Sequence, residues 1–477
     1  MTKHRAPKPP RRAAAPRAPW FTLHAPTLLS DAETRLDTRL AWVFAALLAI
    51  ALFLVATGPH VVGDAFTETD FYGAYAEGAR LLQQGQIDPT RYRVVGPGYE
   101  AALALFGLPF RDLLLAAEML SLVSMVAGWL LWVVLLKRRT DARLALIAGA
   151  FIALNPTFFR YGYSATTDAL AFALQALALF LLLARSGLAS AALAGVVAAL
   201  AFLTRYNAVY LLPAGLVALW LGGTLQERRG RAALLFAAGF VAPVVPWVLF
   251  SLARGGALGL ELHHNIAYDV FARSRKIPWD EYQEKMQPQF KTLWDVIAKD
   301  PAAVIKRELF NVWDHLRLDA EKLLRWPVAA AALIGIGFAW VDGTLRRTWP
   351  VVLAGALLFL TLVPVFHSER YSLPLVPIYA LLAAATFASR RWALAIGRSR
   401  RLWLKAVVAV VVLALSLFAS VRYQVRSLQP LPIEVLEVSR TLRALKGPSD
   451  RLLARKPHIA FHGQIKMVPF PFTKNLP

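Results

Sequence analysis

The chain has 477 residues, of which 57% are hydrophobic, and its mean hydropathy is +0.48. This composition is more apolar than that of water-soluble domains and argues against a soluble globular protein. A net charge of +23 would suit a nucleic-acid-binding protein, but the basic residues stand in short clusters between apolar blocks, which indicates membrane loops instead. The chain has no cysteine, which excludes disulfides, thiolate metal sites and cysteine nucleophiles.

Residues 1–40 are rich in Pro, Ala and Arg and show no apolar periodicity. We therefore expect a disordered, basic cytoplasmic tail. A cleavable signal peptide is not expected, because its apolar region would follow a much shorter charged segment.

The rest of the chain contains long apolar blocks, several of them near the roughly 20 residues that a helix needs to cross a bilayer. Because these blocks do not alternate polar and apolar residues, a β-barrel is excluded. The sequence predicts an all-α polytopic membrane protein with about eleven transmembrane helices. The predicted spans are 41–57, 112–136, 143–159, 168–184, 188–203, 208–222, 232–252, 327–341, 350–366, 371–388 and 403–420.

Basic clusters fall in alternate loops of this scheme, on the side of the amino terminus. Because such clusters mark cytoplasmic loops, we expect the amino terminus inside and the carboxyl terminus outside a plasma (inner) membrane. Membrane lipids are then the expected neighbours of these cations, and nucleic acid is not an expected partner. The clusters are Lys137 to Arg139, Arg185, Arg228 to Arg231, Arg346 with Arg347, and Arg390 to Arg401.

The long connections fall on the outer side. They divide the chain into a transmembrane domain over 41–420, with outer loops at 58–111 and 253–326, and an outer carboxyl-terminal segment at 421–477. The first loop predicts an amphipathic helix on the membrane surface that ends at Gly85. Its apolar face is formed by Phe71, Tyr75, Ala79 and Leu82.

Two acids at outer helix ends are candidates for chemistry, since placing an ionisable group in hydrocarbon is costly and such groups usually mark functional sites. Asp70 follows Thr67 at capping-box spacing, so capping alone would also explain it. Asp168 ends the polar turn that begins at Tyr161 and opens a helix, where an acid is again an ordinary cap. The predicted topology places both carboxylates on one face, where two acids can divide acid and base roles.

Arg205 and Arg370 also lie at outer turns. An arginine fork binds phosphate through two parallel hydrogen bonds, although contact with lipid headgroups would explain either residue equally well. His263 and His264 are adjacent, so they do not share a helix face, and we interpret them as solvated loop residues instead of metal ligands.

In their order along residues 40–420, these motifs resemble the GT-C superfamily of membrane glycosyltransferases. The resemblance is closer to the bacterial protein-mannosyltransferase-like and aminoarabinose-transferase-like members, and the tail from Asp450 resembles the outer segment of some uncharacterised members. The motifs are Asp70-Phe71-Tyr72, Pro97-Gly98-Tyr99, Asp168 after Asn155-Pro156, Thr204-Arg205-Tyr206, and Glu369-Arg370-Tyr371 with Pro374 and Pro377.

The resemblance implies a cell-envelope enzyme that transfers a hexose or pentose from a polyprenyl-phosphate carrier to a glycan, lipid or protein at the outer face. Asp70 then corresponds to the base and Asp168 to a second acid. Many relatives have Asp-Glu where this chain has Asp70-Phe71, so Asp64 or Glu68 could be the working acid instead. Arg370, Arg205 and Tyr371 would bind the donor phosphate. Further candidates are Glu77, Tyr99 and Glu369.

No cofactor is predicted. The sequence has no glycine-rich nucleotide loop, and a divalent metal has no support in it. A multi-pass transporter or lipid-linked-sugar flippase is the main alternative, although such proteins carry ionisable groups near the membrane midplane, whereas here they gather at one face. A relative without catalytic activity is a third alternative.

Overall fold

The computed structural model describes residues 31–92, 95–185, 187–222, 228–256, 262–389, 391 and 402–470, and most of these residues are helical. Within them, an apolar helix stands at each predicted span. Six helical stretches are long and apolar enough to cross a membrane. They are α1 (Asp31–Thr57), α4 (Leu113–Arg139), α10 (Arg229–Ala253), α16 (Thr344–Leu362), the stretch Glu369–Ala388 and α20 (Leu402–Leu428).

The other predicted spans are shorter apolar helices. The predicted span 143–159 is interrupted at Asn155-Pro156, and α6 (Pro156–Tyr161) follows the break. Likewise, 371–388 is built from α17 (Glu369–Ser372), the 3₁₀ turn η9 (Leu373–Leu375) and α18 (Val376–Ala388). The shorter helices are α5 (Ala142–Ala153), α7 (Thr167–Leu183), α8 (Leu188–Thr204), η3 (Tyr206–Tyr210) with α9 (Leu211–Leu221), and α15 (Trp326–Val341).

The tail prediction is wrong for its last ten residues, because α1 begins at Asp31. Residues 1–30 lie outside the described part of the chain. The helix continues past the apolar block because residues 31–40 include good helix formers such as Ala, Glu, Leu and Arg and contain no Pro or Gly.

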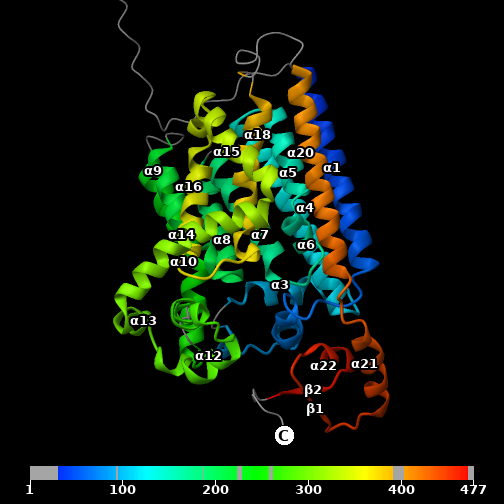
Figure 1. Ribbon diagram of the computed structural model, residues 1–477. Coiled ribbons are helices and arrows are strands. Elements are labelled where there is room, and N and C mark those ends of the chain that lie inside the picture. The colour runs from blue at the N-terminus through cyan, green and yellow to red at the C-terminus, as the bar shows by residue number, and fades with distance from the viewer. Residues whose placement is uncertain are drawn as a thin grey trace, which may run out of the picture.

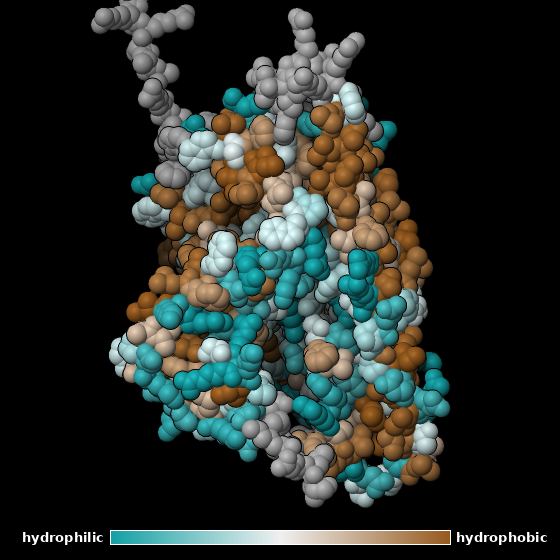
Figure 2. Space-filling view, in the orientation of Figure 1, coloured by the Kyte–Doolittle hydropathy of each residue, from teal (hydrophilic) through white to brown (hydrophobic). Residues whose placement is uncertain are grey.

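The helices form one bundle (Figure 1), and hydrophobic residues cover much of its upper part and right side in Figure 2. In the most apolar 18-residue stretch of each helix, only 6% of the residues of α20 and 11% of those of α10 are buried by protein. Most of their apolar side chains therefore face outward. Such a surface is stable in hydrocarbon and would be an aggregation site in water. Inside the bundle, small residues allow close helix approach. A Cβ added at Gly195 of α8 would lie 2.0 Å from the Phe236 carbonyl oxygen of α10.

The long connections that carry α3 (Gly98–Phe106), α12 (Trp279–Lys285) and α13 (Leu293–Lys299) lie at one end of the bundle (Figure 1). The first outer loop contains the π-helical turn η1 (Phe71–Tyr75), α2 (Ala76–Gln83), η2 (Pro89–Arg91) and α3. Gly85 follows with a φ of +75°, as expected for a residue that ends a helix. The predicted apolar face exists, but it is buried against α3 and α4 instead of lying on a membrane surface.

The second outer loop is largely helical, and it begins in the described chain at Leu262. Its second half is formed mainly by the long helix α14, which continues into the π-helical turn η8. The elements are α11 (His263–Ala267), η5 (Tyr268–Ala272), η6 (Arg273–Arg275), α12 (Trp279–Lys285), η7 (Gln287–Gln289), α13 (Leu293–Lys299), α14 (Pro301–Leu318) and η8 (Asp319–Leu324).

The carboxyl-terminal segment starts later than predicted, because α20 continues to Leu428. It consists of α21 (Glu434–Leu445), β1 (Arg451–Ala454), α22 (His458–Gly463) and β2 (Lys466–Pro469), with the two strands parallel and Arg451 opposite Lys466. The all-α prediction missed this pair. The segment packs on the first outer loop, where the Tyr72 and His458 rings lie 4.2 Å apart.

Candidate active site

Asp70 stands immediately before η1, and its carboxylate faces a cavity of about 350 Å³ at the loop-bearing end of the bundle. Its side chain is 56% exposed, and it makes no capping hydrogen bond to the turn that follows. The capping interpretation therefore does not hold. Asp64 takes that role, because its carboxylate accepts hydrogen bonds from the Phe66 and Thr67 backbone N–H groups at 2.7 and 2.5 Å.

Asp168 lies in the first turn of α7 and is held by two arginines. One carboxylate oxygen accepts from Arg205 Nη1 at 2.5 Å, and the other accepts from Arg370 Nε at 2.6 Å. The Asp168 side chain is only 2% exposed. A buried carboxylate with one guanidinium on each oxygen fixes the direction of both arginines.

Arg370 also connects this pair to Asp70, since its Nη1 lies 3.6 Å from an Asp70 carboxylate oxygen. The guanidinium carbon of Arg205 lies 5.2 Å from the centre of the Tyr371 ring, within cation–π distance. Asp70, Arg205, Arg370 and Tyr371 all line the cavity. The structure thus brings together residues from three predicted outer turns that are far apart in the sequence.

Other residues complete the cavity wall. Burial, together with the nearby Asp70 carboxylate, raises the pKa of Tyr75 above its ordinary value, so its hydroxyl stays protonated at neutral pH. Asn207 and Asn265 add amide groups, and the buried Asn207 side-chain oxygen has no hydrogen-bond partner in the described chain. The sequence analysis did not single out Asn207, because nothing in a single sequence distinguishes it from an ordinary turn residue.

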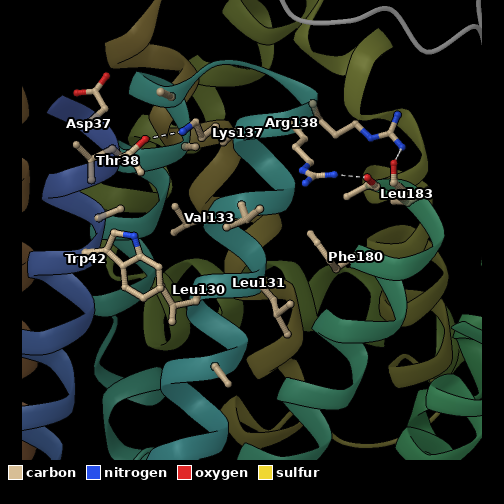
Figure 3. Close-up of a pocket in the computed structure, with 18 residues that line it drawn as sticks. Asp37, Thr38, Trp42, Leu130, Leu131, Val133, Lys137, Arg138, Phe180 and Leu183 are labelled. Atoms are coloured by element: carbon tan, nitrogen blue, oxygen red, sulfur yellow. Dashed lines mark hydrogen bonds between the residues drawn. The ribbon is translucent and has the colours of Figure 1, made fainter. Parts of the chain in front are cut away.

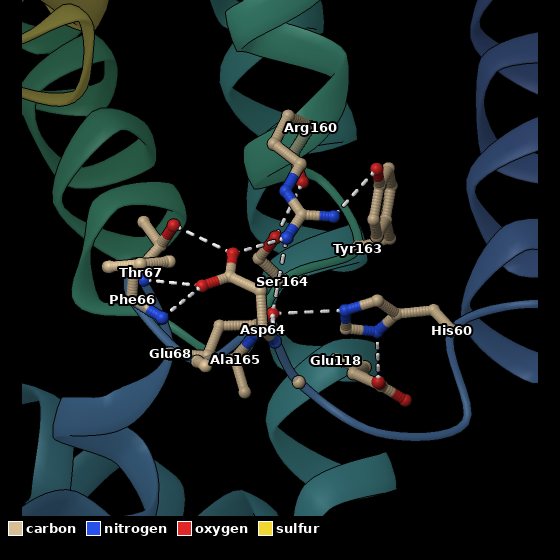
Figure 4. Close-up of polar contacts among 12 residues, drawn as sticks. His60, Asp64, Phe66, Thr67, Glu68, Glu118, Arg160, Tyr163, Ser164 and Ala165 are labelled. Carbon is tan, nitrogen blue, oxygen red and sulfur yellow. Dashed lines mark hydrogen bonds and ion pairs between the residues drawn. The ribbon is translucent and has the colours of Figure 1, made fainter. Parts of the chain in front are cut away.

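Glu68 belongs to a separate buried network (Figure 4). It accepts hydrogen bonds from the backbone N–H groups of Ala165 at 2.7 Å and Asp64 at 3.0 Å, and it pairs with His60 at 3.0 Å. Burial disfavours its charge, but the His60 and Arg160 cations outweigh burial and lower the pKa of Glu68 to about 2. Burial disfavours the charge of His60, but its contacts with Glu68 and with Glu118, at 2.6 Å, outweigh burial and raise its pKa to about 9.

Asp64 is tied to this network through Arg160, whose Nη2 lies 2.6 Å from its carboxylate. Neither Asp64 nor Glu68 lines the cavity that contains Asp70. Both acids instead fasten the first outer loop to the turn before α7. The sequence analysis missed His60 and Arg160, because only the fold brings them to these carboxylates.

The remaining candidates lie outside the cavity wall. Glu77 is 64% exposed and pairs with Arg91 at 3.3 Å. Tyr99 is buried, and Glu369 accepts a hydrogen bond from the Thr157 hydroxyl at 3.3 Å. Among the described residues there is no group of three or more His, Cys, Asp or Glu side chains placed to hold a metal, and the His263 ring contacts the Phe290 carbonyl at 3.3 Å.

About a third of the chain matches a known protein family. Residues 96–247 match the model of the dolichyl-phosphate-mannose-protein mannosyltransferase family. The matched range includes Asp168 and Arg205 but neither Asp70 nor Arg370. No curated protein matches the sequence.

Solved structures match over nearly the whole chain. The oligosaccharyltransferase AglB from Archaeoglobus fulgidus, in complex with an inhibitory peptide and a dolichol-phosphate, is 14% identical with a TM-score of 0.59 over 93% of this chain. ArnT from Cupriavidus metallidurans, bound to undecaprenyl phosphate, is 14% identical with a TM-score of 0.58 over 91% of this chain. The fold of this chain is therefore similar to the folds of AglB and ArnT, and residues 96–247 also match the mannosyltransferase family model.

The extent of the matches differs between these two proteins. This chain spans 86% of the ArnT chain but only 65% of the AglB chain. At such identities the likeness establishes the fold. The chemical role of the cavity around Asp70 depends on the residues that line it in this chain.

Proposed function

We propose that the chain transfers a sugar from a polyprenyl-phosphate donor to an acceptor at the outer face of the membrane. The observation that carries the proposal is the cavity in which an exposed carboxylate, Asp70, faces two arginines held in place by Asp168. A phosphate leaving group needs cations, and an attacking acceptor needs a base. The two requirements are met within one cavity.

The reaction follows from the charges. Asp70 accepts the proton of an acceptor hydroxyl or amine as that atom forms a bond to the anomeric carbon of the sugar. The bond between this carbon and the phosphate oxygen breaks, and its electron pair remains on the phosphate. Arg370 and Arg205 stabilise the charge that develops there, because guanidinium groups bind phosphate oxygens through parallel N–H donors.

Asp168 was predicted to be a second catalytic acid, but its geometry favours a different role. Both of its oxygens are occupied by arginines, and its side chain is almost fully buried. We therefore assign Asp168 as a positioning residue that aims Arg205 and Arg370 at the donor phosphate. Asp70 is the more exposed of the two acids and is the candidate base.

The donor class is supported by the surroundings of the cavity. Structures similar to this one contain undecaprenyl phosphate or dolichol-phosphate, in ArnT and AglB respectively. Apolar wall residues such as Leu262, Leu362 and Val365 stand beside the charged groups. This combination suits a lipid phosphate, whose chain is apolar and whose head is anionic. In the predicted topology the cavity opens at the outer face.

The transferase proposal can be tested with purified protein in vesicles, using labelled polyprenyl-phosphate monosaccharides and a membrane extract as the source of acceptor. We expect label in a product for wild-type protein and for Glu77→Gln, whose exposed acid lies outside the cavity, but not for Asp70→Asn. Movement of labelled donor between leaflets without any product would support the flippase alternative instead.

A further inference from the structure

A second and larger cavity lies at the opposite end of the bundle from Asp70. It measures about 1060 Å³ and is enclosed by α1, α4, α5 and α7 (Figure 3). Helix α4 runs from one end to the other, and its 27 residues span roughly 40 Å at 1.5 Å per residue. The larger cavity is lined by the second half of this helix, from Ala127 to Arg139, whereas the first outer loop joins its other end.

The walls of this cavity are polar at one end and apolar elsewhere. The polar end is formed by Lys137, Arg138 and Arg139 from the last turn of α4, with Asp37 and Thr38 of α1 beside them. Figure 3 shows the apolar remainder, in which Trp42, Leu130, Leu131 and Phe180 surround the same space.

The three cations keep hydrogen-bonding capacity for a ligand. Lys137 Nζ donates to the Thr38 hydroxyl at 2.5 Å, Arg138 Nη1 donates to the Ala184 carbonyl at 2.5 Å, and Arg139 donates to the Leu183 carbonyl. Each of these bonds uses one N–H group, whereas a lysine has three and an arginine has five. Among the described residues that line the cavity, these three cations outnumber the one carboxylate, that of Asp37, so the wall has a positive excess.

A basic last turn has simpler explanations, because cations stabilise a helix carboxyl terminus and mark cytoplasmic loops. Neither explanation accounts for an apolar cavity that opens directly beside the cations. The neighbouring surface is exposed and apolar. Trp42 is 63% exposed, and only 22% of the residues in the most apolar 18-residue stretch of α1 are buried. The cavity thus adjoins the surface that faces lipid.

We propose that this cavity binds an anionic phospholipid from the leaflet opposite the candidate active site. The phosphate would contact Lys137 and Arg138, and an acyl chain would lie along Trp42, Leu130 and Phe180. The cavity and the lipid are complementary in charge, because basic pockets between transmembrane helices bind acidic headgroups. They are also both amphipathic, and the apolar walls exclude ligands that are polar throughout. The proposal does not depend on the transferase assignment.

The test is native mass spectrometry of the full-length protein, delipidated in detergent and titrated with phosphatidylglycerol or with zwitterionic phosphatidylcholine. We expect phosphatidylglycerol to bind at least tenfold more tightly. The double variant Lys137→Gln, Arg138→Gln should lose this preference, because each removed cation costs a charge-assisted hydrogen bond. Arg231→Gln is the matched control, since Arg231 is an exposed basic residue outside the cavity in the same predicted cytoplasmic set.

A cavity-filling variant, Leu130→Trp, keeps every charge and tests the apolar part of the site. We expect it to weaken phosphatidylglycerol binding as well, and it serves if the double variant does not fold. Equal retention of the two lipids by wild-type protein would overturn the proposal. It would also be overturned if phosphatidylglycerol bound the folded double variant or Leu130→Trp as tightly as wild type.

Discussion

Replacing Asp70 by Asn removes the carboxylate charge and keeps the shape of the side chain. The structure predicts a small effect on stability, because the side chain is 56% exposed and its ion pair with Arg370 is long, at 3.6 Å. Ion pairs that are this exposed contribute about 0–1 kcal/mol. Loss of a general base, in contrast, should lower turnover roughly 100-fold to 10,000-fold while donor binding changes little.

The assay compares Asp70→Asn with Asp64→Asn and Glu68→Gln in one membrane preparation, measuring turnover and thermal unfolding together. Glu68 is fully buried and carries four contacts, so Glu68→Gln should lower the unfolding temperature, and any loss of activity should follow the loss of folded protein. Near-normal turnover of Asp70→Asn, with a collapse of turnover in well-folded Asp64→Asn or Glu68→Gln, would refute the assignment of Asp70.

Four further predictions concern neighbouring features. Arg370→Lys keeps the charge but loses the planar fork, so retention of polyprenyl phosphate should weaken by about tenfold, and unchanged affinity in both Lys and Ala variants would remove Arg370 from the donor site. Asp168→Asn leaves two arginines without their shared carboxylate, so the free energy of unfolding should fall by roughly 3 kcal/mol. We expect a lower unfolding temperature and a higher KM for the donor. The His60–Glu68 pair should stabilise the fold most between about pH 4.5 and 6.5, because the pKa of Glu68 falls to about 2 and that of His60 rises to about 9. Stability should therefore decline as pH rises from 6.5 towards 9 or falls from 4.5 towards 2, and thermal unfolding of His60→Gln should show a weaker alkaline decline. Alkaline phosphatase fused after Pro477 should be active in a bacterial host, whereas an active cytoplasmic reporter there would contradict the predicted topology.

Asp64, Glu68 and Asp70 differ in how deeply the fold buries them and in what they contact. All three lie within seven residues of one outer loop, and local pattern treats them alike. In the folded chain Glu68 is inside a hydrogen-bonded network, Asp64 caps the next turn and holds Arg160, and Asp70 faces a cavity. The question that the sequence left open thus concerns environment, which depends on contacts with residues about one hundred positions away, such as Ala165.

The positions of the apolar helices were determined by the sequence alone, because transfer of a helix into hydrocarbon depends on the length and composition of one local stretch. The prediction that Asp70, Arg205 and Arg370 gather at one end of the bundle likewise followed from counting spans, and the cavity confirms that these residues meet. Their chemical roles remain predictions.

Only the tertiary structure decided which groups touch. Asp168 contacts Arg205 and Arg370 because the first turn of α7, the carboxyl end of α8 and the short helix α17 lie beside one another, and no periodicity within one helix specifies that contact. The parallel strands β1 and β2 and the cavity beside Lys137 were missed for the same reason. Hydrophobic burial acts on each segment locally, whereas ion pairs and cavities depend on how distant segments rotate and pack against one another.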